Sequence, residues 1–265
     1  MENWLSQQVI ATTENWSSSI SRHYPEHAEI WINPKKFLEC LDNKLNTLEA
    51  VKYLDWSAIL KGEKLKILDL GCGTGWLSAY LSTFNNVTDI DALDSDQNLL
   101  KMLPEIVTGL KGQVSKINPI NALFSPILRS DQYYDYIVSS SSLYHADNLY
   151  ALARELFRGL KKGGKLVILN ENPYRKFPYL LMAIKKFVAI VLNIFKGKSA
   201  EYSITISKNG IVYDPYLGDK TMTFYQWEDA LVKAGFQVKK IITPFATYKE
   251  KNSAQDKLVH FICQK

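Results

Sequence analysis

Short apolar runs alternate with amphipathic segments along most of the chain from residue 66 onward. Short apolar runs are typical of buried strands, and apolar residues at every third or fourth position are typical of helices. Strands and helices in this order predict a parallel sheet that is covered by helices on both faces. The expected strands are 67–70, 87–94, 113–117, 133–140, 165–169, 236–242 and 257–264, and the expected helices are 76–82, 97–103, 149–162 and 223–234.

Two stretches depart from this alternation. Residues 1–60 carry apolar residues at helical spacing and predict a helical cap, in which the aromatic-dotted segment 15–31 is either a lid or a surface wrap. Residues 174–220 form an insert with an apolar helix at 177–195 and a hairpin expected around Asn209–Gly210. Lysines in the middle of this helix argue against a membrane span. The helix either caps a substrate pocket and contacts a second copy of the chain, lies on a membrane surface, or is buried core.

A glycine-rich turn links the first predicted strand to the first predicted helix. Gly71, Gly73 and Gly75 follow the strand, and the helix begins at Trp76. Glycine is favoured where the backbone needs a positive φ and where a ligand approaches the chain closely. The dinucleotide-binding pattern GxGxxG would need a glycine where Trp76 stands, so the turn is a poor match to a nicotinamide site.

An acidic residue ends the second predicted strand. Asp94 lies about 20 residues beyond the glycines, where doubly wound folds place a carboxylate that binds ribose hydroxyls. The alternative is that Asp94 caps the helix that begins at Gln97, but Asp96 can serve as that cap. We therefore expect Asp94, next to Ser95, to face a ligand.

These motifs resemble a known enzyme family. The pattern Asp69-x-Gly71-x-Gly73-x-Gly75 resembles motif I of the class I S-adenosylmethionine-dependent methyltransferases, and YYDYIVSS and LKKGGKLVI are similar to the approaches to that family's fourth and fifth strands. The resemblance is to the type 11 methyltransferases. It implies a Rossmann-like α/β fold over 61–265, with a doubly wound, mostly parallel sheet of seven strands whose last strand is antiparallel. The likeness is good over 66–169, moderate over 221–265 and poor elsewhere.

The resemblance also implies a set of residues for S-adenosylmethionine. Loop amides near Gly71, Cys72 and Gly73, with Asp69 nearby, would hold the amino-acid end, and Asp94 would hold the ribose. Asn121 and Ala122 would meet the adenine, although the family usually has an acid where Asn121 stands. An asparagine carbonyl can still accept that hydrogen bond. Ser139 would pass beside the sulfonium.

Candidate catalytic residues follow the fourth and fifth strands, at the edge where such folds bind ligands. His145 is the first candidate for a general base, and the alternative is a solvated histidine at the start of a helix. Glu171 is a second candidate, and Tyr144 could face the sulfonium cation. We expect a small, hydrophobic organic acceptor, with oxygen as the first choice of methylated atom, nitrogen the second and carbon the third.

Composition narrows the classes of partner and function that the chain can have. The net charge is +5, and the chain has no basic, aromatic-interleaved region, so we expect no nucleic-acid partner. The three cysteines are scattered and form no CxxC, which predicts a reducing, cytoplasmic setting and no metal site. The polar N-terminus does not resemble a secretory signal. Two rival functions stay open: a non-catalytic S-adenosylmethionine-binding protein and an NAD(P)-dependent oxidoreductase.

Overall fold

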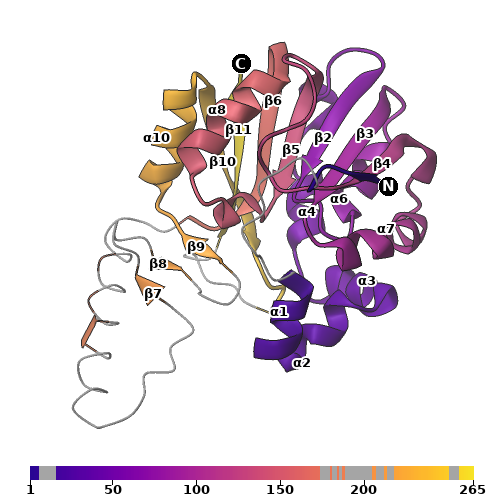
Figure 1. The fold of residues 1–265 in the computed structure, drawn as a ribbon, viewed down its shortest axis with the longest axis vertical. Helices are drawn as coiled ribbons and strands as arrows, with labels where there is room; N and C mark the ends of the chain where they lie inside the picture. The colour runs from indigo at the N-terminus through magenta and orange to yellow at the C-terminus, as the bar shows by residue number, and fades with distance from the viewer. Residues whose placement is uncertain are drawn as a thin grey trace.

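A mixed sheet of eight strands forms the centre of the molecule (Figure 1). The computed structural model describes residues 1–5, 16–173, 180, 184, 187–188, 205–206, 212–213, 218–250 and 257–265. The order across the sheet is β1-β4-β3-β2-β5-β6-β11-β10. The strands are β1 (Glu2–Asn3), β2 (Leu65–Leu70), β3 (Val87–Asp94), β4 (Ile117–Asn121), β5 (Tyr134–Ser140), β6 (Leu160–Glu171), β10 (Gln237–Ala246) and β11 (Lys257–Gln264).

Strand direction follows the expected pattern. Strands β1 to β6 pair in parallel, whereas β11 runs antiparallel to both β6 and β10. The chain order reverses across the adjacent strands β2 and β5, because β2 continues to β3 on one side and β5 to β6 on the other. Doubly wound folds bind their ligands at such a reversal. The predicted Rossmann-like fold with an antiparallel last strand is confirmed.

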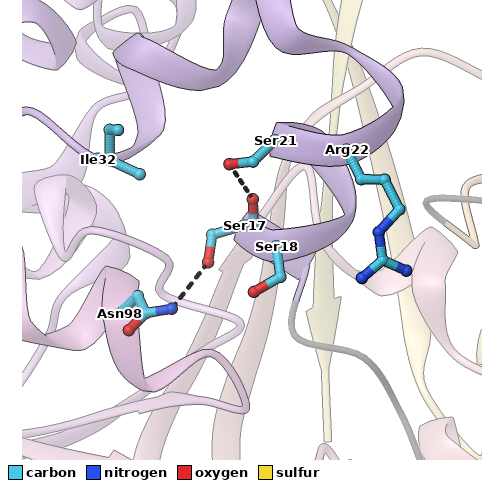
Figure 2. Close-up of a pocket in the computed structure, with 6 residues that line it drawn as sticks. All are labelled: Ser17, Ser18, Ser21, Arg22, Ile32 and Asn98. Carbon is cyan, nitrogen blue, oxygen red and sulfur yellow. Dashed lines mark hydrogen bonds between the residues drawn. The ribbon is translucent and has the colours of Figure 1, made fainter.

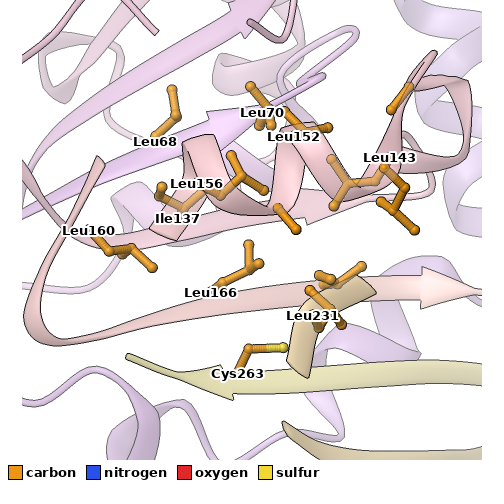
Figure 3. Close-up of a cluster of buried hydrophobic side chains, with 14 of the residues drawn as sticks. Leu68, Leu70, Ile137, Leu143, Leu152, Leu156, Leu160, Leu166, Leu231 and Cys263 are labelled. Atoms are coloured by element: carbon orange, nitrogen blue, oxygen red, sulfur yellow. The ribbon is translucent and has the colours of Figure 1, made fainter. Parts of the chain in front are cut away.

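Helices cover both faces of the sheet. The described helices are α1 (Trp16–His23), α2 (Pro25–Ala28), α3 (Pro34–Asn43), α4 (Thr47–Lys52), α5 (Trp56–Ile59), α6 (Trp76–Ser82), α7 (Gln97–Gly109), α8 (Leu149–Gly159) and α10 (Phe224–Ala234). One apolar cluster joins α8 and α10 to the sheet (Figure 3), and a second joins α5, α6 and α7 to it. Neighbouring residues of β2 divide between the clusters: Leu68 belongs to the first and Ile67 to the second. This alternation places the two clusters on opposite faces.

Several predicted boundaries were wrong: α7 continues to Gly109, β6 begins at Leu160 and β10 continues to Ala246. Residues 113–117 are not the third strand, because Val114–Lys116 form a 3-10 turn and β4 begins at Ile117. Proline is uncommon inside strands because it has no amide hydrogen to donate. Pro119 is tolerated in β4 because the neighbouring strand β1 pairs only with Ile120 and Asn121. The helix expected to reach Gly163 ends at Gly159, since the buried Leu160 already pairs with Tyr134 in the sheet.

The N-terminal region is helical from Trp16 to Ile59, but the chain starts with a strand that the sequence pattern did not indicate. Arg129 holds β1 in place: its guanidinium donates to Glu2 at 2.9 Å and to Asp91 at 3.0 Å. The arginine also lies over the ring of Trp4, 5.0 Å from its centroid. β1 is therefore fixed at the sheet edge by charge and stacking rather than by an apolar pattern.

Only part of the insert is described. Strands β7 (Thr205–Ile206) and β8 (Val212–Tyr213) pair antiparallel on either side of the expected Asn209–Gly210 turn, and β9 (Lys220–Thr221) joins them. Most of the 177–195 helix lies outside the described residues, so its three interpretations stay predictions. In the part of the chain that the structure describes, no helix has the length and apolar character that a membrane crossing requires.

Candidate functional site

A cavity of about 1100 Å³ opens at the carboxyl ends of the parallel strands. Its walls come from the glycine loop after β2, the tips of β3, β5 and β6, and the turn after β4. The N-terminal helices add a wall of large apolar side chains, and the last residues of the insert close another side. The polar residues on its walls include Asp94, Ser95, Ser140, Ser141, Ser142, His145, Asp147, Asn148, Asn170, Glu171, Asp219 and Lys220.

The glycine loop has the backbone geometry that its sequence predicts. Gly71, Gly73 and Gly75 have φ values of 69°, 54° and 82°. A Cβ on Gly71 would lie 2.5 Å from Ser142 Oγ, and one on Gly75 would lie 2.7 Å from Leu103 Cγ, so both positions are closed by packing. A Cβ on Gly73 would meet nothing nearer than 4.0 Å, and this residue lines the cavity. The loop therefore presents open backbone to a ligand at Gly73.

Asp94 turns its carboxylate toward this open backbone. Its two oxygens accept from the Gly73 amide and the Asp96 amide, each at 2.8 Å. Burial raises the pKa of this carboxyl to about 6. Each carboxylate oxygen can accept a second hydrogen bond, so the residue can still bind ribose hydroxyls from the cavity. An open glycine beside a half-buried acid fits a nucleoside that carries an amino-acid end.

Asp96 connects the first helix to this region. Its carboxylate caps α7 by accepting from the Asn98 amide at 2.9 Å, as the sequence predicts, and it also accepts from the Ser17 amide at 2.6 Å. Asn98 donates to Ser17 Oγ at 3.3 Å, and a hollow of about 380 Å³ lies beside this contact (Figure 2). The docked helix brings Trp16 to the cavity wall, which favours the lid interpretation of 15–31.

Five predicted cofactor residues lie behind the cavity wall. They are Asp69, Gly75, Asn121, Ala122 and Ser139, and none of them lines the cavity. Asp69 accepts from Ser78 Oγ at 2.6 Å, and burial raises its pKa to about 7. The side-chain nitrogen of Asn121 donates to the carbonyls of Asp94 and Ser95, and Ser139 shares a hydrogen bond with Ser142. These residues shape the loop and the β3 tip, and their direct contact with cofactor stays a prediction.

All three catalytic candidates line the cavity. His145 Nδ1 lies 3.3 Å from Asp219 Oδ1, and Lys220 Nζ donates to the His145 carbonyl at 2.9 Å. Tyr144 is packed against the His145 ring, with centroids 4.5 Å apart. Burial, with the charges of Asp219 and Glu171, raises the pKa of the Tyr144 hydroxyl. The ring of Trp16, from the N-terminal helix α1, lies 6.4 Å from the His145 ring between centroids, so this group borders the N-terminal wall of the cavity.

Several wall residues gave no signal in the sequence. Asp219 follows His145 by more than 70 residues and is brought to it by the end of the insert. Trp16 lies in a segment flagged only as aromatic and polar, and Ser140 to Ser142 look like an ordinary strand end. The only available clue was topological: the carboxyl ends of parallel strands meet at one edge of a sheet.

Comparison with known proteins identifies the family. A family model described as a methyltransferase domain matches residues 35–187, more than half of the chain. The chain belongs to this family, and its fold is that of the class I enzymes, whose cofactor is S-adenosylmethionine.

The curated relatives differ in the atom that they methylate. The chain is 29% identical to a ubiquinone biosynthesis O-methyltransferase of Rickettsia felis over 47% of its length and 49% of the relative's. It is 29% identical to phosphoethanolamine N-methyltransferase 3 of Arabidopsis thaliana, over 52% and 28%. A ubiquinone/menaquinone biosynthesis C-methyltransferase of Yersinia enterocolitica is 30% identical over 44% and 46%. The chain thus spans about half or less of the length of these relatives.

Solved structures show the same fold at low identity. An S-adenosylmethionine-dependent methyltransferase of Mesorhizobium loti matches with a TM-score of 0.51 and 18% identity, over 79% of this chain and 95% of that one. One from Aquifex aeolicus matches with a TM-score of 0.51 and 14% identity, over 95% and 99%. These likenesses support the fold alone.

Proposed function

We propose that this protein transfers the methyl group of S-adenosylmethionine to a hydroxyl oxygen of a small, largely apolar organic acceptor. The observation that carries the proposal is the open backbone of Gly73, with the half-buried Asp94 carboxylate beside it at the tip of β3. The cavity continues from there to His145 and Glu171, so one space has room for both reactants.

The cofactor side of the cavity provides binding and orientation. Bound S-adenosylmethionine would supply an activated methyl group on a positively charged sulfur. Asp94 would accept hydrogen bonds from the cofactor's ribose hydroxyls, and the loop at Gly71 to Gly73 would offer backbone to its amino-acid end. Aromatic side chains, Trp16 and Trp31 among them, exclude water from the cavity. Alignment of two reactants contributes about 7–11 kcal/mol to such a reaction when orientation is good.

The acceptor side provides a general base. His145 would take the proton of the acceptor hydroxyl, while the bound cofactor would supply the methyl group and leave as S-adenosylhomocysteine. Asp219, 3.3 Å from Nδ1, stabilises the resulting imidazolium. Lys220 holds the backbone at His145 in place by donating to its carbonyl. A neutral imidazole whose Nδ1 proton faces Asp219 suits oxygen as the methylated atom, because its Nε2 then carries no proton and can take the acidic proton of a hydroxyl acceptor.

Replacement of His145 tests this assignment. His145→Ala should lower kcat about 10²- to 10⁴-fold, which is the usual contribution of a positioned base. The affinity for S-adenosylhomocysteine should stay within about twofold of the original protein, because the residue faces the acceptor. Single-turnover assays over a panel of phenols and alcohols, with calorimetry of the product, make both measurements. Unchanged turnover in His145→Ala would show that His145 is not the general base.

The cellular location of the protein and its binding partners are proposals as well. The three cysteines are free thiols, which supports a cytoplasmic location. Contact with a membrane surface through 177–195, or a homodimer through the same helix, rests on its apolar sequence. Leu180, Ile184, Phe187 and Val188 of this helix are exposed, which supports either form of contact.

A further inference from the structure

The tip of β6 contains an extra residue. Phe261 of β11 lies opposite Ile168, whereas Val259 lies opposite Glu171. One residue of β11 therefore faces two residues of β6, which defines a β-bulge at Leu169 and Asn170. Asn170 has a φ of +58°, a left-handed conformation that is uncommon outside glycine.

The bulge changes the face on which Glu171 lies. Side chains alternate between the faces of a strand, and in β6 Val167 and Leu169 pack on the α6 side while Ile168 packs on the α8 side. Regular alternation would put Glu171 with Val167 and Leu169. The extra residue instead brings Glu171 to the same face as its partner Val259, which belongs to the α8 cluster. The irregular strand thus directs the carboxyl to the α8 side of the cavity, where apolar residues of that cluster also line it.

His260 holds this irregularity. The ring is fully buried, and its Nδ1 accepts from the Asn170 amide at 3.0 Å while its Nε2 lies 2.8 Å from the Ala50 carbonyl. An amide nitrogen only donates and a carbonyl only accepts, so Nδ1 has no proton and Nε2 has one. His260 is therefore neutral, and it satisfies the backbone amide that the bulge removes from the strand ladder. The Asn170 side chain adds hydrogen bonds to Thr47 and Ser140.

The carboxyl of Glu171 is buried, and one of its oxygens has no partner among the described residues. Glu171 is 2% exposed, and its Oε1 has no hydrogen-bond partner among the residues that the structure describes. An unsatisfied buried carboxyl is costly, so it indicates a group that arrives from outside the protein. Leu152, Met222 and Trp227 also line the cavity and belong to the apolar cluster on this face.

We propose that Glu171 is the hydrogen-bond partner of a hydroxyl group on the methyl acceptor, and that His260 is the positioning residue that fixes it by locking the bulge at Asn170. This inference rests on the proposed function, since it concerns the acceptor side of the same cavity. Burial raises the pKa of Glu171 to about 8, so the carboxyl is protonated at neutral pH and both donates and accepts, as a hydroxyl does. The acceptor then has two polar ends, one at His145 and one at Glu171.

Two replacements of His260 separate its roles. In His260→Asn, the amide oxygen stands near the former Nδ1 and can still accept from Asn170. In His260→Gln, the amide group stands near the former Nε2, so the link to Ala50 survives and the bulge amide loses its acceptor. The readout is the titration of Glu171, followed by NMR of protein with ¹³C-labelled glutamate and bound S-adenosylhomocysteine, and assigned with Glu171→Gln.

We expect a Glu171 pKa of about 8 in the original protein and in His260→Asn. In His260→Gln it should fall by about one pH unit or more toward its ordinary value, because a loosened bulge admits water. Affinity for S-adenosylhomocysteine should change less than about twofold in both variants, which shows that the fold is intact. An identical Glu171 titration in all three proteins would overturn the role of His260. If the original protein did not bind S-adenosylhomocysteine at all, the proposed function itself would be wrong.

The chemistry of the acceptor group is tested with two probes. Catechol, an aromatic ring with two hydroxyls, should shift the Glu171 resonance in the product-bound original protein and in His260→Asn, and about tenfold more weakly in His260→Gln. Benzylamine, a cation of similar size, should leave the Glu171 pKa unchanged. Absence of any catechol response in the original protein, or a pKa lowered by benzylamine, would overturn the hydroxyl assignment.

Discussion

Glu171 shows at the scale of one residue how a binding site differs from a core. Residues 166–169 of β6 are apolar and fully buried, whereas the Glu171 carboxyl is buried without a partner for Oε1 among the described side chains. Such a group lowers stability and is retained only where it has a use, as strained or unsatisfied groups often are at functional sites.

Replacing this carboxyl should therefore stabilise the free protein. Glu171→Met should raise the free energy of unfolding by about 1–3 kcal/mol at pH 8.5, because a buried unsatisfied group is removed. The folded pKa of about 8 lies above the ordinary 4.5, so Glu171 favours the folded state at low pH and this contribution is lost as pH rises through 8. The gain of the variant should accordingly grow from about pH 5 to pH 8 and level off above pH 8.

Thermal unfolding of both proteins across this pH range is the measurement. A variant that is less stable than the original at every pH would mean that Glu171 has a structural role. Turnover should fall in the same variant, so stability and activity are expected to change in opposite directions.

At the scale of elements, the glycine loop can be tested with a matched pair of glycines. Gly73 and Gly163 have φ values of 54° and 79°, and a Cβ would meet no atom closer than 4.0 Å at either position. In each variant, the strain of an alanine at positive φ should lower the free energy of unfolding by about 1–2 kcal/mol. Only Gly73 lines the cavity, so only Gly73→Ala should lose affinity for S-adenosylhomocysteine, by about tenfold or more.

Chemical denaturation and calorimetry of the two variants separate strain from binding. Equal losses of affinity in Gly73→Ala and Gly163→Ala would mean that the loop does not approach the cofactor. The pair is informative because Gly163 lies in β6 and is absent from the cavity wall.

Elements differed in how well the sequence predicted them. Lys257–Gln264 was predicted to the residue, since its alternation is clear, and Asp94 and Asp96 were given roles that their contacts fit. Strand β4 was misplaced because Pro119 hides a strand at a weakly paired edge, and β1 was missed because it is held by Arg129 rather than by apolar contacts. Periodicity reports burial, so elements held by ion pairs escape it.

The sequence predicted those parts of the candidate site that are encoded within a short segment of the chain. The glycine loop, Asp94 and His145 lie within short motifs or directly at strand ends, where the sequence order fixes their position. Asp219 and the bulge that turns Glu171 depend on contacts between segments far apart in the chain, with His260 lying 90 residues from Asn170. No spacing in the sequence encodes such contacts.

At the scale of the whole molecule, the family and fold determine the donor while the cavity walls determine the acceptor. The methyltransferase domain accounts for residues 35–187, but the walls also draw on residues beyond it, including Asp219 and Trp227. Relatives named as O-, N- and C-methyltransferases each match about half of this chain. Acceptor choice must therefore be sought in the segments where the chain differs from them.

The central claim is that the cavity binds S-adenosylmethionine through Asp94. Titration calorimetry with S-adenosylhomocysteine, and separately with NAD, tests it most directly. We expect one S-adenosylhomocysteine per chain, no measurable binding of NAD, and a loss of roughly 1.5–3 kcal/mol in Asp94→Ala. Asp89→Ala, on the same strand but outside the cavity wall, should bind like the original protein. Binding of NAD without S-adenosylhomocysteine, or an unchanged affinity in Asp94→Ala, would contradict the account.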